Sequence, residues 1–96
     1  MTLDIKEYEK IQKHCKEVAI RKNANYGCDG LRKFGLKGMI IRMSHKMDRL
    51  VNLGYNNEKD LNQESIEDTC LDLVNYAIYC VMLQRKKLEA SNSKEK

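Results

Sequence analysis

The sequence predicts an all-α domain, and its composition and its hydrophobic spacing support this fold class. The 96 residues include no proline, no tryptophan and only five glycines. A chain of this kind, rich in lysine, glutamate, leucine, isoleucine and methionine, is typical of helices and unlike a β-sandwich or barrel. Apolar residues also recur at steps of three and four in three long segments. We therefore expect a compact bundle of three main helices with a glycine-containing loop and a short helical turn.

The length of the chain is sufficient for one domain. We place a single helical domain at residues 1–89 and expect the charged tail, 90–96, to be disordered. Apolar residues make up 42% of the sequence, enough for one modest core. Because such a core is marginal at this size, we expect a ligand or a second copy of the chain to add stability. A large enzyme with its own cofactor domain is excluded.

The first helix is predicted from about Thr2 to Asn23. Its apolar residues form one stripe, while lysines and glutamates occupy the other face. Gly27, just after the helix, is suited to a left-handed cap. The stripe consists of Ile5, Tyr8, Ile11, Cys15, Val18 and Ala19.

Four of the five glycines fall within the twelve residues 27–38, so we expect the most irregular backbone there, with one short turn over Leu31–Phe34. A second long helix is predicted from about Lys37 to Leu53 and is stopped by Gly54. Arg42, Lys46 and Arg49 lie together on one face of that helix, next to His45, and we call these three residues the cationic stripe. Its apolar stripe is Ile40, Met43, Met47, Leu50 and Val51.

The last helix is predicted from about Asn62 to Leu88. Between Cys70 and Leu83 it is apolar almost all round, so we expect it at the centre of the bundle or in an interface between subunits. Polar residues nevertheless step along one side of it, and polar groups on a buried helix need partners. Glu64, Asp68 and Asp72, which we call the acidic stripe, are followed on that side by Asn75 and Tyr79.

The cationic and acidic stripes allow two interpretations. They can form an interhelical salt-bridge network that only sets the register of the helices. Alternatively, the basic groups hold phosphate oxygens while the acidic groups hold a divalent metal or a ribose hydroxyl. The two are compatible, because a carboxylate can orient an arginine or lysine that binds the ligand.

The segment 22–27 is a second candidate element. Backbone amides near Gly27 can cradle a phosphate, with Lys22 and Asn25 beside it, and Tyr26 can stack on a base. The alternative is a helix cap followed by a surface loop. The glycine spacing matches neither a P-loop nor a dinucleotide-binding fingerprint.

Other features exclude several classes of function. The four cysteines are too widely separated for a zinc or redox motif, so we expect reduced, buried thiols in a cytoplasmic protein. The charged start, 1–7, is unlike a signal peptide, and the longest apolar run is too short to cross a membrane. The net charge of +4, with acids on the candidate face, argues against direct DNA binding.

Several motifs in order resemble the nucleotide modification-associated domain family 1, a family of small all-helical proteins common in phages and prophages. They are KNANYG at 22–27, FGLKG at 34–38, RMSHKMDRL at 42–50, and ESIEDT at 64–69 continuing to DLVNYA at 72–77. The resemblance spans roughly residues 20–78 and implies an all-helical fold and a link to nucleotides. Its motif residues here are Asn23, Tyr26, Gly27, Arg42, Lys46, Arg49, Glu64, Asp68, Asp72 and Asn75.

Two positions depart from that family pattern. Asn25 and His45 stand where relatives usually carry aspartate, and both changes remove a carboxylate and make the region more cationic. If those carboxylates bind metal in a catalytic relative, this chain lacks part of the set. The departures therefore favour holding an anion over hydrolysing one.

We accordingly expect a nucleotide-binding protein that sequesters a phosphate-bearing nucleotide without turnover and without a cofactor. A cyclic nucleotide or an NAD-derived immune signal would suit an anti-defence role in the host cytoplasm if the chain is phage-encoded. Because enclosure requires more surface than one small chain offers, we expect a homo-oligomer with the pocket between subunits. The expected ligand-binding residues are Lys22, Asn25, Tyr26, Gly27, Arg42, His45, Lys46, Arg49, Asp68, Asp72 and Asn75.

Two other functions stay open. In a metal-dependent, all-α nucleotide pyrophosphohydrolase, Glu64, Asp68 and Asp72 would bind Mg²⁺ and the cationic stripe would bind phosphates. The second acidic motif of such enzymes, EExxE, is not reproduced on the first helix. In a structural or partner-binding helical module, the stripes would be salt bridges and the 22–27 segment a surface loop.

Overall fold

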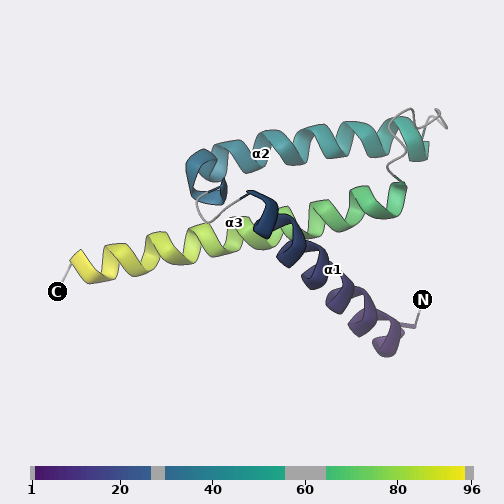
Figure 1. Cartoon of the computed structure of the whole chain (residues 1–96), viewed down its shortest axis with the longest axis horizontal. Coiled ribbons are helices and arrows are strands. Elements are labelled where there is room, and N and C mark those ends of the chain that lie inside the picture. Colours follow the sequence, from purple (N-terminus) through teal and green to yellow (C-terminus); the bar gives the residue numbers. More distant parts are fainter. Residues whose placement is uncertain (1, 27–29, 56–64, 95–96) are drawn as a thin grey trace.

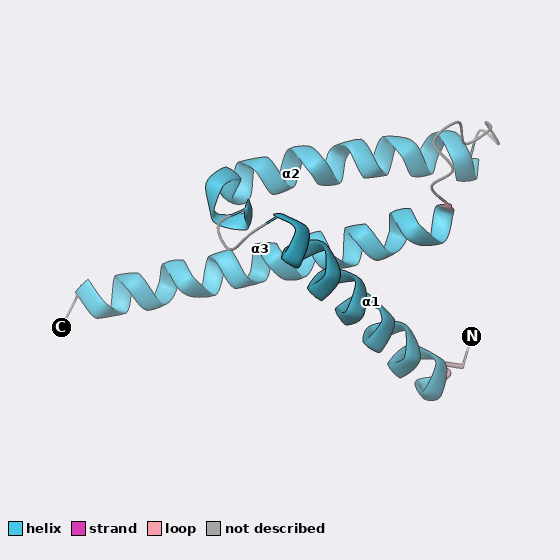
Figure 2. Cartoon of the chain, viewed as in Figure 1, coloured by secondary structure: helices cyan, strands magenta, loops and turns pink. Residues whose placement is uncertain are grey.

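The computed structural model describes residues 2–26, 30–55 and 65–94, and side chains within 2–23, 35–55 and 65–86. This part of the chain consists of helices and short connections, without a strand (Figure 2). The predicted all-α fold with three main helices is therefore confirmed. The elements are α1 (Ile5–Tyr26), α2 (Gly30–Leu50), the π-helical turn η1 (Val51–Tyr55) and α3 (Ile66–Lys94).

The helix α1 begins three residues later than predicted because Asp4 caps it. The Asp4 side chain accepts a hydrogen bond from the backbone N–H of Glu7 at 3.1 Å. The Asp4 carbonyl accepts the N–H of Tyr8 at 2.9 Å. The first contact satisfies a backbone donor that has no partner within the helix, and the second is the first hydrogen bond of the regular helical series.

The helix α2 contains the predicted short turn and most of the predicted second helix, separated by a kink at Gly35. Gly35 has φ 59° and ψ −162°, a conformation open almost only to glycine. The predicted stop at Gly54 is not seen as a helix end, because the helical backbone continues from α2 through η1 to Tyr55.

We expect the Gly35→Ala substitution to reduce the free energy of unfolding by about 2 kcal/mol, because a Cβ atom strains this backbone conformation. No neighbouring atom lies within 4 Å of the added Cβ, so a loss would report the backbone alone. Gly54→Ala is the control, since its Cβ would meet the Ile66 side chain at 4.0 Å, an ordinary contact. Urea denaturation of both variants measures the effect, and equal stabilities would contradict the assigned strain.

The start of α3 is fixed by a reciprocal capping arrangement. The Ser65 hydroxyl accepts the backbone N–H of Asp68 at 3.0 Å, and the Asp68 carboxylate accepts the N–H of Ser65 at 3.3 Å. These two hydrogen bonds cap the amino-terminal end of the helix, so α3 begins at Ile66, four residues after the predicted start at Asn62. At its other end α3 passes Leu88 and continues to Lys94, into the segment 90–96.

The central helix is α3, which is one of the two positions predicted for it, because both α1 and α2 pack against it. Figure 1 shows α2 running antiparallel along α3, whereas α1 crosses α3 near its middle and points away from the pair. The radius of gyration is 16.0 Å, compared with about 12.5 Å for a compact chain of this length. The expectation of a compact bundle is therefore wrong for the single chain, because the first half of α1 lies outside the packed region.

On part of α3 the polar side chains are buried and the apolar side chains are exposed. Among the described side chains, the buried apolar ones are few: Cys15, Val18, Met39 and Leu71. Three polar side chains of α3, Thr69, Asp72 and Asn75, are buried beside them, while apolar residues such as Val74, Ile78 and Val81 are exposed. The polar side of α3 thus faces the other helices. No helix in the described part of the chain is long and apolar enough to span a membrane.

Candidate functional site

The carboxylate of Asp72 lies where the three helices meet and contacts a lysine from each of the other two. The Nζ atom of Lys22 on α1 lies 2.5 Å from Oδ1, and the Nζ atom of Lys46 on α2 lies 3.0 Å from Oδ2. We call these three residues the lysine–aspartate cluster. Lys46 follows Lys22 by 24 residues in the sequence, and Asp72 follows Lys46 by 26. The cluster therefore connects all three helices through one buried acid.

Asp72 is the ionised residue at the centre of this cluster. Burial alone would raise the pKa of the Asp72 carboxyl group, but the hydrogen bonds and positive charges of Lys22 and Lys46 outweigh it, so the net pKa is lowered. Asp72 is therefore ionised at neutral pH and attracts the ammonium groups of both lysines.

The two lysines differ in their access to solvent. The Asp72 side chain is 5% exposed, that of Lys46 is 21% exposed and that of Lys22 is 45% exposed. An anion from solution can therefore approach the ammonium groups, above all that of Lys22, without displacing the carboxylate. A lysine ammonium group carries three donors, so the contact of Lys22 with Asp72 leaves further N–H groups of Lys22 for a ligand.

Two buried polar residues flank Asp72 on α3. The Thr69 hydroxyl donates to the Ser65 carbonyl at 3.0 Å. The Asn75 side-chain amide donates to the backbone carbonyl of Cys15 at 3.1 Å and thereby ties α3 to α1. Asn75 is one of the expected ligand-binding residues, and that role stays a prediction beside the structural contact seen here.

The remaining residues of the cationic stripe lie on α2 beside Lys46. Arg42 and Arg49 are half-buried, and each makes at least one interaction within the protein. His45 is exposed on the same helix. The facing of basic and acidic helices, predicted from the sequence, is thus seen in the contact between Lys46 and Asp72.

The acidic stripe does not act as one group. Asp68 is exposed and caps the start of α3, Asp72 binds the two lysines, and Glu64 lies outside the described residues. Both carboxylate oxygens of Asp72 contact ammonium groups, whose positive charges would repel a metal cation. Within 2–26, 30–55 and 65–94, no group of three His, Cys, Asp or Glu residues is arranged to hold a metal.

The 22–27 segment lies partly within the described part of the structure. Lys22 belongs to the lysine–aspartate cluster, and Asn25 and Tyr26 form the end of α1. The side chains of Asn25 and Tyr26 and the whole of Gly27 lie outside the described part of the structure. The phosphate cradle and base stacking proposed for them stay predictions.

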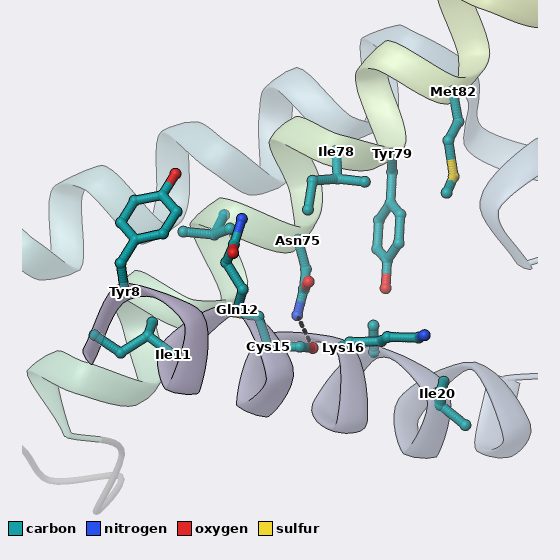
Figure 3. A pocket seen from close by; sticks show the side chains of 12 residues that line it. Tyr8, Ile11, Gln12, Cys15, Lys16, Ile20, Asn75, Ile78, Tyr79 and Met82 are labelled. Carbon is teal, nitrogen blue, oxygen red and sulfur yellow. Dashed lines mark hydrogen bonds between the residues drawn. The ribbon is translucent and has the colours of Figure 1, made fainter. Parts of the chain in front are cut away.

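A groove of about 740 Å³ lies between α1 and α3 and is lined by residues of both helices (Figure 3). Its walls are mostly apolar and include Ile11, Ile20 and Ile78, and Asn75 reaches across it to α1. Tyr79 also lines the groove, and burial raises the pKa of its hydroxyl group. None of the cationic-stripe residues lines this groove, so it is a surface distinct from the one expected to hold phosphates.

Acid should destabilise the fold through Asp72. Because the folded-state pKa of Asp72 is lowered, the unfolded chain binds more protons below about pH 4, and stability is lost as pH falls through the folded pKa. We expect the melting temperature to fall more steeply below pH 4 in the wild type than in Asp72→Asn. Thermal unfolding followed by circular dichroism from pH 7 to pH 2 tests this, and parallel curves would contradict it.

Two features of the site were not predicted from the sequence. Thr69 was not singled out, although its place three residues before Asp72 on the polar side of α3 was a usable signal. The groove depends on the angle at which α1 crosses α3, and residue spacing does not encode that angle. No family model, no curated protein and no solved structure matches the chain.

Proposed function

We propose that this protein binds a phosphate-bearing nucleotide at the lysine–aspartate cluster and releases it unchanged. The observation that carries the proposal is the exposure of Lys22, whose ammonium group contacts Asp72 although its side chain is 45% exposed. An ammonium group carries three donors, so Lys22 can also donate to a phosphate oxygen from solution. Lys46 contacts the other oxygen of Asp72, and Arg42 and Arg49 lie on the same helix as Lys46.

Capture is favoured over hydrolysis by the state of Asp72. A metal-dependent hydrolase needs carboxylate oxygens that face a metal ion or a water. Here one oxygen contacts Lys22 and the other contacts Lys46. Asp72 therefore holds the ammonium groups of Lys22 and Lys46 in place, although it is the acid that the hydrolase would need as a metal ligand.

The nucleotide part of the proposal is supported by the motif resemblance between residues 20 and 78. The departures at Asn25 and His45 add to the cationic character of the segment and of α2. A cyclic nucleotide or NAD-derived signal, captured by a homo-oligomer in the cytoplasm of a phage-infected host, is the form of the function that we propose.

The proposal is tested by incubating the purified chain with a defined mixture of nucleotides. The mixture contains ribonucleoside mono-, di- and triphosphates, cyclic mono- and dinucleotides, and NAD. After gel filtration and denaturation, mass spectrometry of the released small molecules should find one class enriched and intact. Enrichment of a cleavage product would favour the hydrolase, and recovery of no nucleotide would contradict binding.

A second candidate function is a structural or partner-binding helical module. It is favoured by the same contacts, because Asp72 joins α1, α2 and α3 through its two lysines. In that case the cluster serves stability alone. The two functions predict different results when Lys46 is changed: loss of nucleotide binding for the first and loss of stability alone for the second.

A further inference from the structure

The single chain exposes more surface than a compact monomer of its mass. Its accessible surface is 8211 Å², whereas a compact monomer of 11.2 kDa has about 5,700 Å². The excess of about 2,500 Å² is larger than the roughly 800 Å² that each partner buries in a typical stable complex. A permanent interface of this chain therefore has ample surface available to it.

Much of the exposed apolar surface lies on α1 and α3, around the groove described above. Ile11 and Ile20 from α1 and Ile78 and Met82 from α3 all line the groove, and all are substantially exposed. Figure 3 shows Ile78 and Met82 extending from α3 toward α1, with Ile11 and Ile20 farther along α1 on either side of Cys15. Clustered apolar exposure of this kind marks an interaction site.

The charges along α1 indicate which partner fits. Residues 4–9 carry three acids and one lysine, whereas residues 10–21 carry four cations and one acid. A second α1 lying antiparallel to the first would bring the acidic start of each chain's helix, residues 4–9, toward the basic segment 10–21 of the other. Such self-complementarity is what a two-fold symmetric interface requires.

We infer that a second copy of this chain covers the groove, with its α1 antiparallel to the first. The occupant must be present whenever the chain folds, because few apolar side chains of the described residues are buried within one copy. A copy of the same chain meets that condition. This inference identifies the interface of the oligomer in the proposed function, but its test contains no nucleotide, so either can fail without the other.

The test is the molar mass in solution, measured by light scattering over a range of concentrations. The wild type should have the mass of two chains or a multiple of it. Ile20→Glu, in the groove, should dissociate at concentrations at which Ile41→Glu stays associated. Ile41 is a matched control, because it is an isoleucine on α2 outside the groove with 57% exposure, compared with 61% for Ile20.

A second variant keeps the test valid if Ile20→Glu does not fold. Glu7→Lys combined with Glu9→Lys changes only exposed side chains and reverses the net charge of residues 4–9. It should raise the dissociation constant at least tenfold at low salt, with helix content unchanged by circular dichroism. Two results would overturn the inference. One is a wild type with the mass of one chain at every concentration. The other is association of Ile20→Glu and of the Glu7→Lys, Glu9→Lys variant that is as tight as that of Ile41→Glu.

Discussion

Replacing Asp72 by alanine is expected to lower the free energy of unfolding by about 3 kcal/mol. The side chain is buried and contacts ammonium groups from two other helices, so its removal leaves two like charges facing each other. The loss lies at the lower end for a broken buried ion pair, because Lys22 can turn toward water. Urea denaturation monitored by circular dichroism measures it.

Two further variants show whether the loss comes from the cluster. Asp48→Ala, which changes an exposed acid on α2, should alter stability by no more than about 0.5 kcal/mol. A triple variant with Lys22→Met, Lys46→Met and Asp72→Leu should recover most of the stability, since apolar packing can replace a buried ion pair. If Asp72→Ala were as stable as Asp48→Ala, the cluster would not hold the helices together.

Replacing Lys46 by glutamine is expected to weaken nucleotide binding at least tenfold while the fold is retained. A charge-assisted hydrogen bond to phosphate is worth about 1.5–3 kcal/mol, and 1.4 kcal/mol corresponds to a factor of ten. Stability should fall by only about 1 kcal/mol, because Asp72 keeps its contact with Lys22. Isothermal titration with the nucleotide identified by mass spectrometry gives the dissociation constant.

Lys37→Gln is the control for this change, because Lys37 is an exposed lysine on the same helix outside the cationic stripe. It should bind the nucleotide as the wild type does. The structural module predicts a different pattern, in which Lys46→Gln loses stability and has no nucleotide binding to lose. Equal binding by the Lys46 and Lys37 variants would remove Lys46 from the site.

The hydrophobic spacing was enough to predict the three helices and the central position of α3. It also placed Lys46 and Asp72 on facing helices, where the structure brings them to 3.0 Å. Helix ends were less predictable, because they depend on hydrogen bonds of single side chains. Asp4 and Ser65 each set a helix start that apolar spacing placed three and four residues earlier, respectively.

The shape of the chain could not be predicted from the same information. A stripe such as that of α1 shows that a face will be covered, but not whether a helix of the same chain or of another copy covers it. Here Cys15 and Val18 are buried within the chain, whereas Tyr8 and Ile11 of the same stripe are exposed. The contact of Lys22 with Asp72 likewise depends on where α1 crosses α3.

In the proposed function, the ammonium groups of Lys22 and Lys46 bind a phosphate although both contact Asp72. The most direct test is NMR of the lysine side-chain signals during titration with ATP as the probe. We expect saturable shifts of the Lys22 and Lys46 signals, with the Lys37 signal unchanged. Signals of Lys22 and Lys46 that stay fixed, or that move no more than Lys37 does, would contradict it.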